Sequence, residues 1–176
     1  MNLRQAILEE HSKTQTSKIV AWVGSSQERF DQLMNLFLKD EYRVVQRAGW
    51  SLSYCAIKHP SLVQKHFRAF FRLLKDETAH PAVRRNILRL LPSVKIPVKY
   101  HGEAIDQCVR FLTTPGEKAA AKAFSLHVLQ NLAATYPDII GEVSAIIHDQ
   151  WDREAPSFRS RAKKFLNHFP LRQPQH

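Results

Sequence analysis

The chain has 176 residues, of which 44% are apolar and 24% are charged, and it carries a formal net charge of +10. This length and apolar content are sufficient for one soluble domain with a buried core. The sequence contains no apolar run of about 18 residues, the length that spanning a bilayer requires. Because the N-terminus begins directly with a polar amphipathic pattern and lacks the apolar core of a signal peptide, we expect a cytoplasmic protein.

Residues that could carry catalysis or bind a metal are sparse. Cys55 and Cys108 lie far apart and belong to no metal-binding motif, so we interpret both as small buried side chains. No P-loop, dinucleotide-binding glycine pattern or nucleophile elbow occurs. We therefore predict no catalytic residue, no cofactor and no metal, and we favour a non-enzymatic protein. Trp151 and Asp152 form the one acid–aromatic pair that we note as a candidate pocket.

The positive charge is concentrated in one stretch of the chain. Residues 42–101 hold twelve Lys and Arg against only Asp76 and Glu77, whereas the flanking segments are nearly neutral. A concentrated charge of one sign attracts anionic partners and raises their encounter rate. This localisation is the strongest functional signal in the sequence.

Apolar periodicity predicts helices almost throughout, and no strand is expected. The first two predicted helices, over residues 2–12 and 17–24, would form an N-terminal cap within residues 1–25. Pairs of helices follow, with an extended connection at residues 93–99 and a frayed, disordered tail at residues 171–176.

The helix pairs repeat along the chain. The apolar residue that anchors each second helix recurs at spacings of 38, 38 and 37 positions: Val45, Val83, Ala121 and Phe158. Each preceding helix closes on an Asp or Thr that we expect to cap the next helix: Asp40, Asp76, Thr114 and Asp149. A helix pair of this length cannot bury its apolar face alone, so successive pairs must stack.

On these residues the chain resembles the HEAT and armadillo repeat families. The likeness rests on the turn acids Asp40, Asp76 and Asp149 and on the apolar–basic steps Val83–Arg84 and Phe158–Arg159. The resemblance implies an all-α, right-handed α-solenoid of about four to five antiparallel helix pairs, forming one domain over residues 1–170. It also implies that Arg84 and Arg159 pair with turn acids of neighbouring units.

If the second helices line a concave surface, as the resemblance implies, the repeat columns identify its residues. A column is the set of residues at the same number of positions after the anchor in every repeat. Columns zero, four and seven are predicted to form the core. Columns one, two, five and six are predicted to form a basic groove with apolar patches. The candidate binding residues come from this groove and from one face of the helix anchored at Val45. They are Arg43, Arg47, Trp50, Tyr54, Arg85, Leu88, Arg89, Lys122, His127 and Lys163.

Two interpretations of Trp50 remain open. Arg43, Arg47, Trp50 and Tyr54 share one face of a helix, and an exposed indole beside guanidinium groups suits a phosphate backbone or an acidic peptide. Alternatively, Trp50 packs under a neighbouring helix and the arginines are simply solvated. The exposed face of another helix, carrying Arg68 and Arg72, shows that the basic charge is not confined to the groove.

The leading functional hypothesis is a helical-repeat scaffold that binds a protein or an acidic peptide through its basic concave surface. The alternative is a nucleic-acid-binding protein, because a high isoelectric point and a clustered basic patch are typical of such proteins. The DNA alkylation-repair glycosylases also use HEAT-like stacks, and the chain is similar to them in architecture. Their aspartate and tryptophan arrangement is not found on the groove columns. No membrane partner is expected, and the oligomeric state is not predicted.

Overall fold

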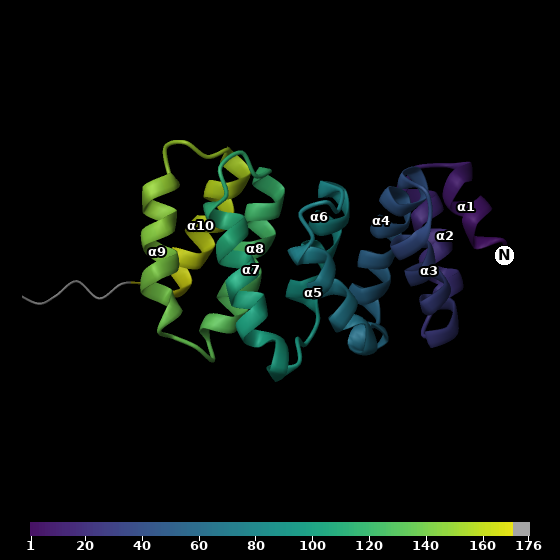
Figure 1. The fold of residues 1–176 in the computed structure, drawn as a ribbon, viewed down its shortest axis with the longest axis horizontal. Helices are drawn as coiled ribbons and strands as arrows, with labels where there is room; N and C mark the ends of the chain where they lie inside the picture. Colours follow the sequence, from purple (N-terminus) through teal and green to yellow (C-terminus); the bar gives the residue numbers. More distant parts are fainter. Residues whose placement is uncertain (171–176) are drawn as a thin grey trace, which may run out of the picture. The chain divides into compact units, whose positions relative to one another are not determined.

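The computed structural model describes residues 1–170, in which every regular element is a helix (Figure 1). The predicted disordered tail, residues 171–176, lies outside the described residues. No helix within residues 1–170 has the length and apolar content needed to cross a membrane. The α-helices are α1 (Leu3–Glu9), α2 (Lys13–Val23), α3 (Gln27–Lys39), α4 (Tyr42–Lys58), α5 (Phe67–Lys75), α6 (Pro81–Leu90), α7 (His101–Thr113), α8 (Ala119–Ala133), α9 (Ile139–Gln150) and α10 (Pro156–His168); three 3-10 helices are η1 (Pro60–His66), η2 (Leu91–Ser93) and η3 (Val98–Tyr100).

The chain folds as two compact units, Met1–Pro97 and Val98–His176. The boundary falls within residues 93–99, the connection that the sequence predicts to be extended. Within that connection, Val94 and Ile96 are each only 8% exposed and belong to a core, whereas Val98 is 74% exposed.

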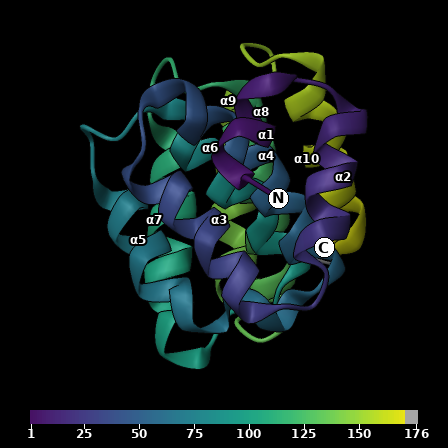
Figure 2. The same cartoon turned by 90° about the vertical axis from the view of Figure 1, so that its right-hand side faces the viewer.

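Helix α4 is the centre of the first unit. It packs against α1, α2 and α3 on one side and against α6 on the other. Figure 2 views this unit from its N-terminal end, with α1, α2 and α3 in front of α4. The seventeen residues of α4 bury Val44, Ala48 and Leu52 completely. A helix surrounded in this way presents only a narrow open face, and that face carries the candidate binding residues of α4.

Helices α4 and α6 approach each other closely because the contact is made at a glycine. A Cβ atom placed on Gly49 would lie 2.6 Å from Asn86 Nδ2 and 3.0 Å from a ring carbon of Phe37. Asn86 is buried and donates a hydrogen bond from Nδ2 to the Ala82 carbonyl at 2.9 Å. The pair Gly49 and Asn86 therefore fixes a short separation between the two helices.

The second unit is organised around α8, which packs against α7 and α10, while α9 packs against α7. The predicted core columns are confirmed in both units. Eleven of the twelve positions are buried, and Val45 is the half-buried exception: Val45, Gly49, Leu52, Val83, Ile87, Leu90, Ala121, Ser125, Val128, Phe158, Ala162 and Phe165. The repeat period thus places the apolar faces of the second helices correctly.

The prediction that the turn acids cap the following helices is wrong. The Asp40 carboxylate accepts bonds from the Glu41 amide at 2.7 Å and from Arg4 Nε at 3.0 Å, and α4 has no side-chain cap. Asp76 accepts from the amide and hydroxyl of Thr78, and His80 Nδ1 caps α6 instead. In both cases the helix begins too far along the chain for the acid to cap it, so Asp40 and Asp76 bond within their own turns.

The other two positions do not cap the following helix either. Thr114 donates its hydroxyl hydrogen bond back to the Arg110 carbonyl at 2.7 Å, and Lys118 occupies the N-cap position of α8. Asp149 lies inside α9 and pairs with Arg153, which lies in the turn after this helix.

Candidate functional site

The predicted basic and aromatic stripe of the first unit lies on the open face of α4. Arg43 is exposed, Arg47 and Trp50 are half-buried, and Tyr54 is 40% exposed. Arg85 and Arg89, both half-buried, lie on the neighbouring α6. Seven of the ten predicted binding residues thus lie on two adjacent helices, and six of them are at least partly exposed.

Arg47 is engaged by the protein itself. Its guanidinium donates hydrogen bonds to the carbonyl oxygens of Ile7 at 3.3 Å and Leu8 at 2.9 Å. These carbonyls belong to the last turn of α1, where backbone acceptors lack partners within the helix. Arg47 therefore attaches α1 to α4, and this role explains its basic side chain without a ligand.

Trp50 belongs to an aromatic cluster at the edge of this surface. Its ring lies 5.1 Å from the His11 ring and 6.2 Å from the Tyr54 ring, with interplanar angles of 56° and 49°. The indole is half-buried, so neither a fully exposed stacking platform nor a fully covered side chain describes it. His11 was not predicted, because it lies between α1 and α2, outside the repeat columns.

A surface hollow opens between α4 and α6, and we call it the α4–α6 hollow. Its volume is about 180 Å³, and it is lined by His11, Gln46, Trp50, Arg85, Asn86 and Arg89. Among the described residues, this lining offers guanidinium, amide, imidazole and indole groups and no carboxylate. The hollow is therefore rich in hydrogen-bond donors and positive in charge.

The α4–α6 hollow brings the like charges of Arg85 and Arg89 close together. The pKa of Arg89 is lowered, first because burial removes water from its guanidinium and then because Arg85 carries the same charge nearby. Tyr54 acts in the opposite direction on this pKa. Within residues 1–170, the buried Nε–H of Arg85 has no hydrogen-bond acceptor. A buried donor without an acceptor costs about 1–3 kcal/mol.

The structure differs from the prediction for Leu88 and Lys122. Leu88 is fully buried in α6, which is covered by α4 on one side and α5 on the other. Lys122 is 4% exposed in α8, which lies between α7 and α10. A helix with neighbours on both sides buries a wider stripe than the four-column pattern assumes. Neither side chain lies on the predicted open groove.

The remaining predicted residues, His127 and Lys163, lie in the second unit on α8 and α10. His127 is half-buried, and its pKa is lowered by burial and then by the charges of Arg161 and Lys164. Lys163 is exposed. Arg161 donates a hydrogen bond to Gln130 Oε1. Arg161 and Lys164 thus form a second, smaller group of cations near His127.

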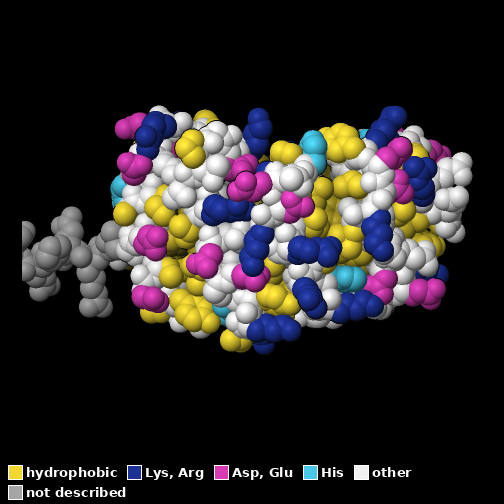
Figure 3. Space-filling view, in the orientation of Figure 1, with side chains coloured by type: hydrophobic (Ala, Val, Ile, Leu, Met, Phe, Trp, Pro, Cys, Tyr) yellow, Lys and Arg dark blue, Asp and Glu magenta, His cyan; other side chains and the backbone are white. Residues whose placement is uncertain are grey.

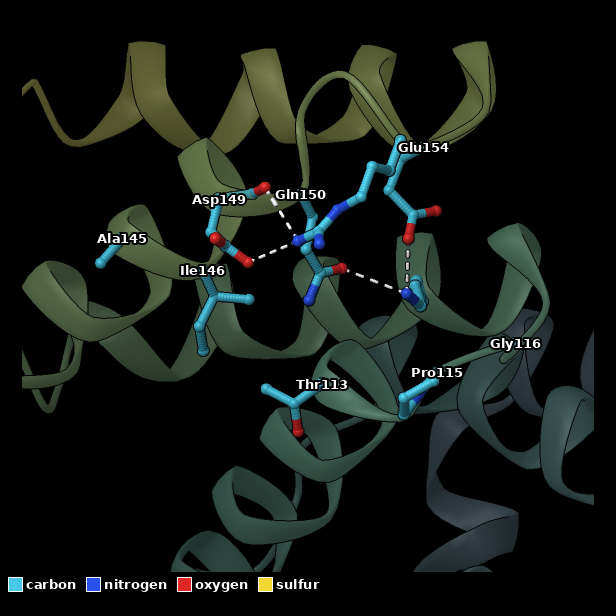
Figure 4. A pocket seen from close by; sticks show the side chains of 10 residues that line it. Thr113, Pro115, Gly116, Ala145, Ile146, Asp149, Gln150 and Glu154 are labelled. Atoms are coloured by element: carbon cyan, nitrogen blue, oxygen red, sulfur yellow. Dashed lines mark hydrogen bonds and ion pairs between the residues drawn. The ribbon is translucent and has the colours of Figure 1, made fainter.

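Lys122 lies in the wall of the largest described pocket, which has a volume of about 700 Å³ and lies in the second unit (Figure 4). Its ammonium donates to Glu154 Oε1 at 2.5 Å and to Gln150 Oε1 at 3.1 Å. Asp149 and Arg153 pair with each other at 2.6 Å at the same wall. Because these charges neutralise one another, the pocket presents no net charge to a ligand. Trp151 and Asp152, the predicted acid–aromatic pair, are not among its lining residues.

Features that would support metal binding or thiol chemistry are weak in the described residues. No group of three or more His, Cys, Asp or Glu side chains in residues 1–170 is arranged to hold a metal ion. The prediction that Cys55 and Cys108 are buried is confirmed. Burial raises the pKa of each thiol to about 12, which keeps both protonated at neutral pH.

Comparison with known proteins identifies the repeat. The sequence matches the family described as HEAT repeat domain over residues 3–169, nearly the whole described chain. The chain belongs to the HEAT repeat family. Neither the curated proteins nor the solved structures contain a match. The predicted all-α architecture of stacked helix pairs is confirmed, and the chain is a helical-repeat scaffold.

The resemblance suggests that the arginine of each apolar–basic step pairs with a turn acid of a neighbouring repeat. In this HEAT repeat chain, Arg84 instead lies near Asp76, a turn acid of its own repeat. The pKa of the Asp76 carboxyl is lowered mainly by hydrogen bonds from Thr78, and the nearby charge of Arg84 contributes further. Arg84 therefore lies close to the acid that ends the first helix of the same pair.

The HEAT repeat chain carries most of its excess charge in the first unit. Met1–Pro97 contains sixteen Lys and Arg side chains and eight Asp and Glu side chains. On the face drawn in Figure 3, Lys and Arg side chains gather around the position of α5, whose exposed cations include Arg68 and Arg72. The basic charge thus occurs on both of these surfaces, and the α4–α6 surface combines it with a hollow and aromatic rings.

Proposed function

We propose that this HEAT repeat chain is a non-enzymatic scaffold that binds an acidic segment of a partner protein through the open face of α4 and α6. The α4–α6 hollow carries the proposal, because its donors and cations are not opposed by a carboxylate in the lining. HEAT repeats commonly mediate protein interactions, which supports a protein partner.

The composition of this face suits a short acidic segment with an apolar anchor. Arg85 and Arg89 offer planar forks that pair with a carboxylate in two-point contacts. Trp50 and Tyr54 lie beside them and supply apolar area that a neighbouring side chain of the segment can cover. Charge would then raise the rate of encounter, and the apolar contact would slow dissociation.

A nucleic-acid strand is the second candidate, favoured by the exposed ring of Tyr54 beside the cations of α4 and α6. Bases stack on such rings, and phosphates pair with guanidinium groups. Binding of this kind loses affinity steeply with added salt, because each phosphate contact releases counterions. Salt dependence therefore separates the two candidates.

The test is fluorescence anisotropy with four labelled probes: a glutamate-rich peptide containing one leucine, single-stranded DNA, double-stranded DNA and single-stranded RNA. Each is titrated across a salt series with the native chain and with the double variant Arg85→Gln, Arg89→Gln. The matched control is Arg68→Gln, Arg72→Gln, which removes the same charge from the exposed face of α5. Arg47 is left unchanged because it holds α1 in place.

Peptide binding that weakens in the α6 variant and persists in the α5 control would support the proposal. Nucleic-acid binding with a steep salt slope, lost in the same variant, would establish the second candidate. Equal weakening in both variants would show that only total charge matters, and would refute a specific role of the α4–α6 surface.

A further inference from the structure

We propose that a hollow between α2 and α4 binds one leucine-sized apolar side chain of the acidic partner segment. This inference rests on the proposed function and names the apolar anchor of the segment and the place that it occupies. We call the site the α2–α4 hollow, and its lining includes Lys13, Thr16, Val20, Ala21, Tyr54 and Lys58. All of these residues belong to the first unit.

The walls of the α2–α4 hollow are mainly apolar. Val20 and Ala21 come from α2, and the ring of Tyr54 comes from α4. The hydroxyl of Thr16 already donates to the Ser12 carbonyl at 2.9 Å, so the methyl group is the part of Thr16 that remains for a ligand. Lysine side chains are also apolar along most of their length. An apolar side chain placed here would lose contact with water and meet mainly carbon atoms.

Large exposed apolar side chains gather beside this hollow. Tyr54 and Ile57 are 40% and 43% exposed, and their spacing makes them neighbours on the surface of α4. The other large apolar side chains that are exposed in residues 1–170 lie far from this turn in the sequence: Met1, Tyr42 and Val98. Covering exposed apolar area is favourable in water. The turn of α4 beside the α2–α4 hollow therefore favours an apolar ligand.

The size of the hollow suits a single side chain. Its volume is about 180 Å³. An apolar cavity of about 150 Å³ is sufficient for a benzene molecule. The α2–α4 hollow therefore accommodates the isobutyl group of one leucine.

Lysines on both helices determine the kind of partner that the hollow accepts. Lys13 lies on α2 and Lys58 on α4, both are exposed, and the lining contains no Asp or Glu. Neither lysine forms an ion pair within residues 1–170. Carboxylates that flank the leucine can therefore pair with these ammonium groups and raise the rate of encounter. A second copy of this chain, with its net charge of +10, lacks that complementarity.

Tyr54 connects the α2–α4 hollow to the proposed binding face of α4 and α6. Its ring lies 6.2 Å from that of Trp50, which lines the α4–α6 hollow. The two residues are one helical turn apart, a rise of about 6 Å along α4. An extended segment covers this distance in about two residues. One short segment can therefore place its leucine in the α2–α4 hollow and nearby carboxylates at the α4–α6 surface.

The first part of the test compares two labelled peptides by fluorescence anisotropy. One is a glutamate-rich peptide with a single central leucine, and the other has alanine in place of the leucine. The alanine peptide should bind the native chain about tenfold more weakly, because most of the isobutyl group is no longer available for burial. Equal affinities would overturn the inference.

The second part locates this difference in the hollow. Ala21→Leu adds an apolar side chain to the wall of the α2–α4 hollow at an exposed position, and should bring the two peptides to similar affinity. The matched control is Ala120→Leu, the same change at an exposed position of α8, which should retain the tenfold difference. Circular dichroism checks that both variants remain folded. A difference that persists in Ala21→Leu would overturn the inference.

The third part tests the flanking lysines. Lys13→Gln, Lys58→Gln should weaken both peptides about threefold and leave their ratio unchanged, because exposed ion pairs contribute little each. The matched control is Lys18→Gln, Lys39→Gln, which removes the same charge from exposed positions of α2 and α3 outside the lining. Equal weakening by both double variants would contradict the charge complementarity of the hollow.

NMR on the complex of the native chain gives a direct readout. With the leucine methyl groups of the peptide labelled with carbon-13, intermolecular nuclear Overhauser effects should reach the Val20 methyl groups and the Tyr54 ring. Effects to Trp50 and His11 without Val20 would place the leucine in the α4–α6 hollow and overturn the inference.

The outcomes separate this inference from the proposed function. Equal affinity for the leucine and alanine peptides would refute the apolar anchor and leave an acidic-segment scaffold intact. Absence of binding by either peptide would refute both. Dimerisation in analytical ultracentrifugation that Ala21→Leu abolishes and Ala120→Leu retains would assign the hollow to a second copy and refute the partner segment.

Discussion

The buried pair of Lys122 and Glu154 provides a quantitative test of how the second unit is stabilised. The two side chains are only 6% and 14% exposed and meet at 2.5 Å, and Gln150 accepts a further bond from the ammonium. Replacing Lys122 with Met preserves the apolar stem but leaves the Glu154 carboxylate buried without its cation. The free energy of unfolding should fall by about 3–5 kcal/mol, the usual cost of breaking a buried pair from one side.

The assay is urea unfolding followed by circular dichroism and tryptophan fluorescence, to which the half-buried Trp151 of the second unit contributes. Adding Glu154→Gln to Lys122→Met should restore most of the lost stability, because no buried charge then remains unpaired. The control is Arg153→Met at the same pocket wall, where the pair with Asp149 is exposed and contributes about 0.5 kcal/mol or less. Two results would refute this reasoning. One is a loss of unfolding free energy below about 1 kcal/mol for Lys122→Met. The other is a double variant whose loss of unfolding free energy equals the sum of the losses in the two single variants.

Three further predictions concern stability and reactivity. Gly49→Ala forces a methyl group into the contact between α4 and α6 and should destabilise the chain by about 1–3 kcal/mol in urea unfolding. The control is Gly141→Ala in α9, where a Cβ atom meets open space, and this change should stabilise the chain by roughly 0.5–1 kcal/mol. The hydrogen bond from Arg4 lowers the pKa of the Asp40 carboxyl. The pair of Asp40 with Arg4 therefore stabilises the folded chain above the ordinary aspartate pKa, and this stabilisation is lost as pH falls through the lowered, folded-state pKa. Asp40→Asn should therefore lower the melting temperature at neutral pH and have no effect in strong acid; an equal effect at both would contradict the ion pair. The Cys108 thiol, with its pKa raised to about 12 by burial, should resist alkylation in the native chain at pH 8 and react fully in denaturant, as mass spectrometry would show.

The sequence alone determined the all-α repeat and the positions of its core. The spacing of Val45, Val83, Ala121 and Phe158 places the apolar faces correctly, because a helix period and a repeat period are both local properties of the chain. Burial of Cys55 and Cys108 followed in the same way from residue type. A one-dimensional pattern contains this information because each repeat contacts mainly its neighbours.

Only the tertiary structure decided which of the predicted surface side chains are exposed to solvent. Leu88, Lys122 and Lys163 were all assigned to the open surface, yet Leu88 and Lys122 are buried and Lys163 is exposed. The difference arises from how many helices cover α6, α8 and α10, and neighbouring helices are chosen by the whole fold. A column of equivalent positions therefore predicts a common direction on the helix, but not a common exposure.

The α4–α6 hollow likewise exists only in three dimensions. It requires His11, which lies outside every repeat column, and Asn86, which the column pattern did not select. It also requires Gly49, where the absence of a side chain lets two helices approach. Sequence periodicity locates residues along single helices, whereas a donor-lined hollow depends on the distance between two helices and on the loop beside them. That distance is set by close packing between specific side chains, which no local pattern encodes.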